Sequence, residues 1–147
     1  MSVPLKLVDT GKAEYRLDAQ VGFLLRKANQ RHLAIFAQHI GDLTPPQFAA
    51  LAKLSEVGET SQNQLGQMVA MDTATIKGVI DRLKARGLVA LADHDSDRRR
   101  IVVGLTPAGR ATVETLLAKA EAVTAQTLAP LSGREAATLA RLLEKIG

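Results

Sequence analysis

The segment from Asp93 to Gly109, "DHDSDRRRIVVGLTPAG", constrains the fold more than any other part of the sequence. Its first eight residues are charged or histidine, with the exception of one serine, and the apolar run "IVVGL" follows immediately. Alternating apolar and β-branched residues favour a strand, and the preceding stretch "LVALA" is compatible with another. We therefore expect a two-stranded hairpin, in which polar residues from His94 to Arg98 connect the strands and form a charged tip.

The rest of the chain favours helices that are separated by glycine and proline. Apolar residues recur at helical spacing from Glu14 to about His39, which predicts one long helix that ends before Gly41. Further helices are expected from Pro45 to Gly58, within 60–72, from Thr73 to Arg86, from Pro107 to about Pro130 and from Arg134 to Ile146.

Side chains that can cap the starts of helices support these boundaries. A serine or threonine followed three residues later by glutamine or glutamate forms a capping box, which satisfies free backbone N–H groups. This spacing occurs at Thr44 with Gln47, Ser61 with Gln64 and Ser132 with Glu135, while Asp72 and Thr106 are expected to cap as single residues. The two short helices joined by "AMD" form a helix-turn-helix candidate, so the middle of the chain resembles a winged helix.

Length and composition fit one domain with one hydrophobic core. The chain has 147 residues, 46% hydrophobic and few aromatic, so the core must consist mainly of leucine, alanine, valine and isoleucine. The absence of cysteine excludes disulfides, thiolate zinc sites and a thiol redox switch. No apolar run approaches the roughly 20 residues that cross a bilayer, so we expect a cytoplasmic protein. The net charge of +4 is compatible with a nucleic-acid partner.

The predicted helix from Thr73 to Arg86 has two contrasting sides. Ile76, Val79, Ile80 and Leu83 share the side that must face the core, and the opposite side centres on Ala74, Gly78 and Asp81. A glycine inside a helix costs about 1 kcal/mol relative to alanine, and close approach to a DNA groove would explain one here. The alternative is a solvated face with an incidental glycine. Residues beside the small pair that could reach base edges and phosphates are Thr73, Thr75, Lys77 and Arg82.

The charged tip of the hairpin suits the minor groove of DNA. Arg98, Arg99 and Arg100 could extend past the preceding helix into that narrow, electronegative groove, and paired strands would hold the tip out rigidly. Asp97 could hold the guanidinium of Arg99 in position by a paired hydrogen bond. The alternative is that the tip is a soluble, charged loop.

Three stretches resemble the MarR family of bacterial transcriptional regulators: "DRRRIVVGLTPAG", "LTPPQFAAL" and "TATIKGVIDRLKARGLV". With the terminal helices, the resemblance covers nearly the whole chain. It implies a mainly α fold with a small β-hairpin wing, in which residues 44–106 form a winged helix-turn-helix. It also implies a homodimer that joins through residues 14–40 and 107–147. The abundance of leucine and alanine in the C-terminal helices agrees with such an interface.

The resemblance also implies roles for single residues. Asp97 and Arg99 match the wing's paired acid and minor-groove arginine, and Thr73, Thr75 and Lys77 match the contact region of the recognition helix. Phosphate contacts are expected from Arg98, Arg100, Ser61, Gln62 and Asn63. The partner would be a double-stranded, pseudo-palindromic operator read by recognition helices about 34 Å apart, which implies a nucleoid-associated bacterial protein.

Many members of this family release DNA when a small, often aromatic anion binds between the first two helices and the dimerisation helices. The stretch "LLRKANQRH" is similar to regulators of aromatic-acid breakdown. We expect His32 to face inward and Arg16 or Arg31 to meet a carboxylate. The alternative is that His32 is a packed or solvent-edge histidine. Other residues expected at this ligand site are Leu25, Asn29, Phe36 and Phe48.

The sequence therefore predicts a ligand-responsive, homodimeric DNA-binding regulator, most simply a repressor. No catalytic constellation, phosphate-binding glycine loop or metal-ligand cluster emerges, so we expect neither an enzyme nor a cofactor. The alternative is a winged-helix protein-interaction module that does not bind DNA. The two differ in salt dependence, because DNA binding weakens steeply as the salt concentration rises.

Overall fold

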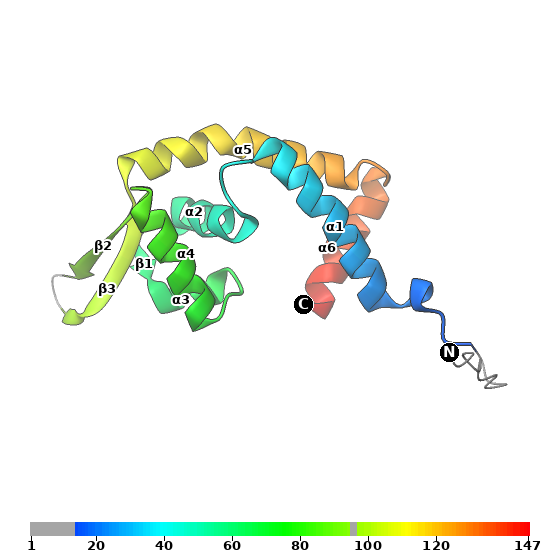
Figure 1. The fold of residues 1–147 in the computed structure, drawn as a ribbon, viewed down its shortest axis with the longest axis horizontal. Coiled ribbons are helices and arrows are strands. Elements are labelled where there is room, and N and C mark those ends of the chain that lie inside the picture. Colours follow the sequence, from blue (N-terminus) through cyan, green and yellow to red (C-terminus); the bar gives the residue numbers. More distant parts are fainter. Residues whose placement is uncertain (1–13, 95–96) are drawn as a thin grey trace, which may run out of the picture.

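The computed structural model describes residues 14–94 and 97–147 and shows a helical molecule with a small sheet at one end (Figure 1). The mainly α fold with a hairpin wing is confirmed. The elements are η1 (Leu17–Ala19), α1 (Val21–His39), α2 (Pro45–Val57), β1 (Thr60–Ser61), α3 (Gln62–Met68), α4 (Thr73–Ala85), β2 (Val89–His94), β3 (Asp97–Leu105), α5 (Pro107–Leu128) and α6 (Gly133–Ile146).

The prediction of one long helix from Glu14 is wrong at its start, because the structure has a short 3-10 helix, η1, that is separate from α1. Gln20 between them is extended, with φ of −81° and ψ of 138°. Its backbone N–H donates to the carbonyl oxygen of Leu17 at 3.0 Å, and its side-chain Nε2 donates to that of Arg16 at 2.8 Å. These bonds close a short turn before α1 begins. Leu17 keeps the apolar spacing through the break, so the periodicity of the sequence does not reveal it.

The wing, formed by β2 and β3, is longer than the sequence predicts. The strands pair antiparallel, with Val89 opposite Leu105 and His94 opposite Asp97. The expected connection from His94 to Arg98 is therefore wrong, and only residues 95–96, which lie outside the described part, separate the strands. The sheet also has a third strand, β1, which pairs with β3 and gives the order β1-β3-β2. A strand of two residues carries no periodicity that could predict it.

Most of the predicted caps are confirmed. Thr44 and Ser132 form complete capping boxes with their glutamine and glutamate partners. The box expected at Ser61 is only half formed: its Oγ accepts from the Gln64 N–H at 3.2 Å, but the Gln64 side-chain oxygen accepts from the Thr60 hydroxyl at 3.0 Å instead. The start of α3 is consequently tied to β1 and thus to the sheet.

The core lies where α2, α3, α4 and the sheet meet. The predicted inner side of α4 is confirmed, because Ile76, Val79, Ile80 and Leu83 are all buried. They pack in one cluster with residues of α2, α3 and β3, including Leu51, Leu65 and Val103. Burial of a leucine- or isoleucine-sized side chain stabilises by about 1.5–3 kcal/mol. The orientation of α4 is therefore fixed by its own apolar side.

The motif "LTPAG" joins the recognition helix, the wing and α5 at one junction. The backbone N–H of Thr106 donates to the carbonyl oxygen of Leu88 at 3.1 Å. The Thr106 hydroxyl donates to the carbonyl oxygen of Gly87 at 2.6 Å and accepts from the Gly109 N–H at 3.0 Å. A Cβ on Gly109 would overlap the Leu88 carbonyl oxygen, so only glycine fits at this position.

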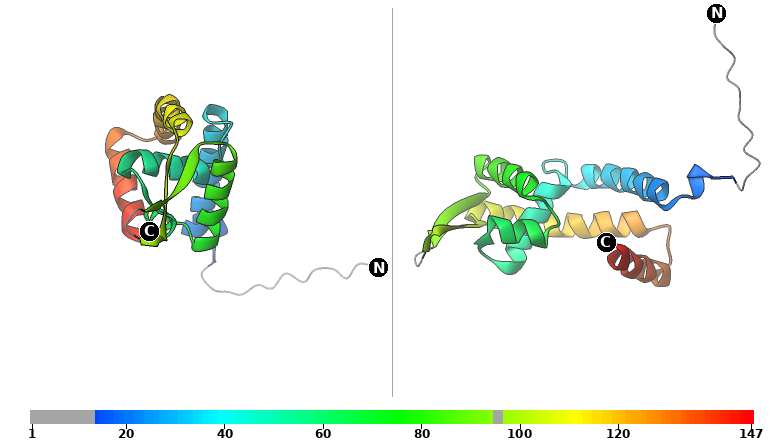
Figure 2. Two further views of the ribbon diagram at one scale, coloured as in Figure 1. Left: turned by 90° about the vertical axis from the view of Figure 1, so that its left-hand side faces the viewer. Right: turned by 90° about the horizontal axis from the view of Figure 1, so that it is seen from below.

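The terminal helices leave large apolar side chains in solvent. α1 and α6 lie on opposite sides of the distal half of α5, at the end of the molecule remote from the wing (Figure 2). α6 contains no buried residue. Exposed apolar side chains of these helices include Val21, Leu24, Leu25, Leu139, Leu142, Leu143 and Ile146. α1 contributes Ile35 and Phe36 to the core, but its exposed apolar side chains and those of α6 take no part in the core, which fits the expected dimerisation role.

We expect Gly109→Ala to lower the free energy of unfolding by at least about 3 kcal/mol, because the added methyl group must displace backbone. Urea unfolding followed by circular dichroism measures the change. Gly133→Ala is the matched control, since a Cβ there meets open space. Equal stability of the two variants would contradict the proposed role of the junction.

Candidate DNA-binding surface

The start of α4 is capped by Asp72, as the sequence predicts. The Asp72 Oδ1 accepts from the Thr75 N–H at 2.7 Å. Hydrogen bonds from the Thr75 side chain and then from its backbone lower the pKa of the Asp72 carboxyl. The cap is therefore ionised at neutral pH, and its negative charge also interacts favourably with the positive end of the helix.

The outer side of α4 is shallow, and no other segment of the chain packs closely against its glycine. Gly78 is half-buried, yet no atom lies within 4 Å of a Cβ built on it. Its lack of a side chain is thus not required by a neighbour within the chain. Thr75, Gly78 and Arg82 line a groove of about 380 Å³ with the start of α2. A helix with this relief can approach another surface closely.

Lys77 carries an ion pair that the sequence analysis did not include. Its Nζ lies 3.1 Å from the Oδ2 of Asp81, one turn further along the outer side. Both side chains are more than half exposed, so the pair contributes little to stability. The carboxylate of Asp81 instead limits the directions in which the lysine points. The spacing of four residues is the sequence signal that indicates this pair.

The other predicted contact residues lie near the start of α3 and α4. Ser61 caps α3 and is half-buried, as is Gln62, whereas Asn63 is exposed. Asn63 and Thr73 line a hollow of about 490 Å³ between the two helices. The helix-turn-helix therefore brings these two residues together.

The wing extends from the body beside α4 (Figure 1). The backbone of Asp97, Arg98, Arg99 and Arg100 forms the first part of β3. The side chains of residues 94–100 lie outside the described part of the structure. The pairing expected between Asp97 and Arg99 therefore stays a prediction.

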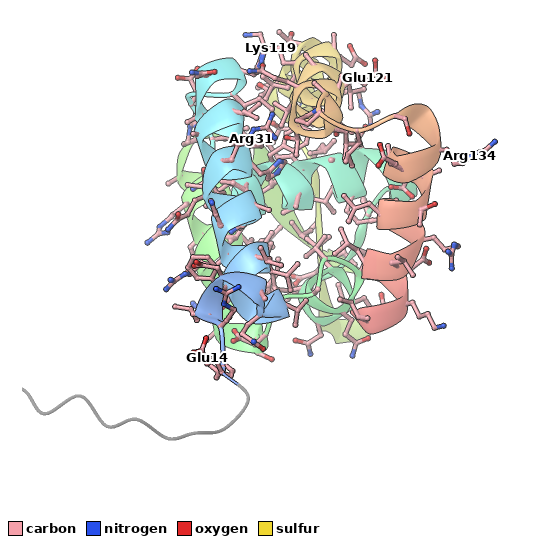
Figure 3. All side chains as sticks on the ribbon, turned by 90° about the vertical axis from the view of Figure 1, so that its right-hand side faces the viewer. Glu14, Arg31, Lys119, Glu121 and Arg134 are labelled. Carbon is pink, nitrogen blue, oxygen red and sulfur yellow. The ribbon has the colours of Figure 1, made fainter. Side chains whose placement is uncertain are left out.

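Two of the basic groups expected at a ligand site are bound to α5. Arg31 donates from Nη1 to the carbonyl oxygen of Thr127 at 2.7 Å and from Nη2 to that of Gln126 at 2.8 Å (Figure 3). His32 Nδ1 lies 2.8 Å from the Thr127 hydroxyl. Because α5 ends at Leu128, the guanidinium caps carbonyl groups at its negative end. We call these contacts between α1 and α5 the polar seam.

The sequence analysis missed the α5 side of the polar seam. A third member is His39, whose Nε2 lies 2.8 Å from the Gln126 Oε1. The partners are separated by 87 to 96 positions. Arg31 binds backbone carbonyl groups, which carry no side-chain signature, and the side-chain partners of His32 and His39 lie too far away in the sequence for a local pattern to indicate them.

The remaining predicted ligand residues lie on α1, on α2 and next to η1. Phe36 is buried and meets Phe48 edge to face, with ring centroids 6.1 Å apart. Leu25 and Asn29 are exposed on α1. Arg16 is exposed next to η1, where it lines a separate hollow of about 400 Å³. Phe36 thus contacts Phe48, Arg31 and His32 contact α5, and Arg16 lines a different hollow.

These elements define a class of protein. A helix-turn-helix formed by α3 and α4, followed by a two-stranded wing, is a winged helix-turn-helix. The MarR family model matches residues 41–100, which include α3, α4, β2 and the first part of β3. The transcriptional repressor NicR of Pseudomonas putida is 41% identical over 134 residues, which cover 90% of this chain and 85% of NicR. The chain belongs to the MarR family and is a DNA-binding transcriptional regulator, not an enzyme.

Solved structures agree with this assignment. A "probable transcriptional regulator" of Pseudomonas aeruginosa is 53% identical, with a TM-score of 0.85 over 90% of this chain and 100% of its own. BpsR of Bordetella bronchiseptica, whose DNA binding is regulated by 6-hydroxynicotinic acid, is 43% identical, with a TM-score of 0.87 over 91% of this chain and 97% of BpsR. Among the described residues, no helix is both long and apolar enough to cross a membrane.

We expect Gly78→Ala to have opposite effects on the stability of the protein and on its affinity for DNA. Alanine should raise the free energy of unfolding by up to about 1 kcal/mol, because it favours a helix and meets no neighbour. It should also weaken DNA binding by about tenfold, or 1.4 kcal/mol, if α4 approaches DNA closely. Thermal unfolding and fluorescence anisotropy with operator DNA measure the two effects.

Gly22→Ala on α1 is the matched control, because this helical glycine also faces open space. It should change stability in the same direction and leave DNA affinity unaltered. If Gly78→Ala binds DNA as tightly as the unmodified protein, the glycine is incidental.

Proposed function

We propose that the protein is a homodimeric repressor that places α4 in the major groove of a pseudo-palindromic operator and the wing in the adjacent minor groove. The observation that carries this proposal is the shallow outer side of α4, where a Cβ at Gly78 would meet no atom within 4 Å. Its proposed base and phosphate contacts are Thr73, Thr75, Lys77 and Arg82. Ser61, Gln62 and Asn63 would contact phosphates at the start of α3, and operator binding would place the protein in the cytoplasm.

The wing would contribute the minor-groove contact. Arg99 would enter the groove with Asp97 holding its guanidinium, and Arg98 and Arg100 would neutralise phosphates. Support comes from the strand pairing that continues to His94 and Asp97. This pairing places the arginines on β3 rather than on a long loop, so the chain loses less conformational entropy when they bind DNA.

The dimer would form through the terminal helices. Leu139, Leu142, Leu143 and Ile146 are exposed at helical spacing on α6, and α1 exposes a further apolar group. A contiguous apolar face of this kind marks an interaction surface, and a second copy of the chain would cover it symmetrically. We assign residues 44–106 to DNA binding and residues 14–40 and 107–147 to dimerisation.

The proposed effector is a small aromatic acid or its thioester. The likeness to BpsR, which responds to 6-hydroxynicotinic acid, supports this chemical class. Its proposed site combines His32, Arg31 and Arg16 for the carboxylate with the apolar side chains of Leu25, Phe36 and Phe48 and the polar side chain of Asn29. Because Arg31 and His32 already bind α5, an entering carboxylate must replace contacts of the polar seam. Binding would therefore alter the packing of α1 against α5 and, through α5, the position of the wing.

Arg99→Ala should weaken operator binding by at least about tenfold, since a buried charged contact contributes more than 1.4 kcal/mol. Fluorescence anisotropy at several salt concentrations measures affinity and salt dependence together. Arg134→Ala, on exposed α6, removes the same charge away from the wing and should leave both unchanged. Unaltered affinity of the Arg99 variant would remove the wing from the mechanism.

His32→Ala should shift the concentration of 6-hydroxynicotinic acid that releases the operator by about tenfold, through the loss of one charged hydrogen bond. Thr127→Val provides the comparison, because it breaks the same 2.8 Å contact while it keeps the imidazole. A larger shift in the His32 variant indicates contact with the effector. Equal shifts would assign His32 to the polar seam alone.

A further inference from the structure

The single acidic side chain of α4 lies on the side that is proposed to face DNA. Asp81 shares the outer side of the helix with Ala74 and Gly78, and its Oδ2 lies 3.1 Å from the Lys77 Nζ. We infer that this pair recognises a G·C base pair in each half of the operator, with Lys77 on the guanine and Asp81 on the cytosine. The inference rests on the proposed function, because it names the base pair that the outer side of α4 contacts.

A carboxylate on a surface that meets DNA requires a specific partner there, because phosphate groups repel it. Asp72, the only other acid between positions 60 and 92, has a structural role as the cap of α4. Within the described residues, the side chain of Asp81 bonds to Lys77 and to no backbone group. Since an exposed pair contributes little to stability, folding does not account for the position of this acid.

The shape of α4 lets this short side chain reach a base edge. An aspartate extends only a little from its helix, so its carboxylate reaches the bases only where the helix backbone comes close to them. Gly78 lies one turn before Asp81 and Ala74 one turn before Gly78, and a Cβ on the glycine would meet open space. These two small residues therefore allow close approach on the same side of the helix.

The direction of the side chains places the pair toward the end of α4 that contacts bases. Helical side chains point back toward the N-terminus, so the Asp81 carboxylate lies over the preceding turn, where it meets Lys77. In a helix-turn-helix, the N-terminal residues of the recognition helix contact base edges. The ammonium and the carboxylate are thus presented together at that end.

The pair offers two donors beside one acceptor, which is the complement of a G·C pair. Beyond its bond to Asp81, the Lys77 ammonium keeps two N–H groups, and Asp81 Oδ1 can only accept. In the major groove, guanine presents the acceptors N7 and O6, and the N4 donor of the paired cytosine follows them. An A·T pair presents its donor between two acceptors and adds a methyl group, so the order of its groups does not match.

The bond between the two side chains also prepares the lysine for this contact. It holds the Lys77 Nζ at 3.1 Å from the carboxylate before DNA arrives, so less side-chain entropy is lost on binding. Loss of the Asp81 carboxylate should therefore reduce the preference for G·C. It should not weaken binding to DNA of unrelated sequence, because the attraction between the protein and phosphates is retained.

The test uses the full-length protein and a pool of DNA duplexes with a randomised central segment. The unmodified protein should select a G·C pair at one position in each half-site, and Asp81→Asn should accept A·T there as well. In fluorescence anisotropy with the selected duplex, replacing that pair by A·T should weaken binding of the unmodified protein at least about tenfold. The same replacement should weaken binding of Asp81→Asn by less than about threefold.

Two further variants make the result specific. Glu56→Gln is the matched control, because Glu56 also lies 3.1 Å from a lysine, Lys53, but on α2. It should keep the base preference of the unmodified protein. Lys77→Ala should lose the preference at the same base pair as Asp81→Asn, since the two side chains act together. Circular dichroism establishes that each variant is folded.

The inference is overturned if Asp81→Asn keeps the full preference for G·C, or if Lys77→Ala changes the preference at a different base pair. An equal rise in the affinity of Asp81→Asn for selected and unrelated duplexes, with the base preference unaltered, would show that the carboxylate only repels phosphates. Failure of the unmodified protein to select any sequence refutes the proposed function itself. Selection of a half-site without such a G·C pair refutes this inference alone.

Discussion

The contact between Thr106, Gly109 and the carbonyl groups of Gly87 and Leu88 is the constraint on which the arrangement of this protein depends. Gly87 and Leu88 form the connection from α4 to the wing, Thr106 caps α5 and Gly109 lies in the first turn of α5. The threonine hydroxyl accepts from the Gly109 N–H and donates to the Gly87 carbonyl oxygen, so it joins the start of α5 to that connection. Because Gly109 has no side chain, the backbone of α5 can lie directly against the Leu88 carbonyl group.

The sequence predicts the features that depend on neighbours in the chain. The caps at Thr44, Asp72 and Ser132 involve residues three positions apart, and the apolar side of α4 follows from helical periodicity. Contacts between distant segments were not predictable in this way. β1 is too short to carry a pattern, and the polar seam joins side chains of α1 to backbone and side-chain groups of α5 that lie 87 to 96 positions away. The contacts of Arg31 and His32 with α5 were consequently not predicted.

Two sets of polar contacts join segments that are distant in the sequence. The polar seam holds α1 against the end of α5, and Arg86 holds the end of α4 against the α1–α2 connection. Each set relies on a guanidinium bound to carbonyl oxygens, which an anion can replace because it binds the same donors more strongly. The core, in contrast, is apolar and closely packed, so ligands can act on the links without unfolding the domain.

The length of α5 makes small rotations consequential. Its 22 residues extend about 33 Å, so a tilt of roughly 5° about its distal end moves the opposite end by about 3 Å. Neighbouring base pairs along a strand are about 3.4 Å apart. A tilt of a few degrees at the distal end of α5 therefore displaces the wing by nearly the spacing of one base pair. A displacement of that size moves a wing arginine away from its position in the minor groove.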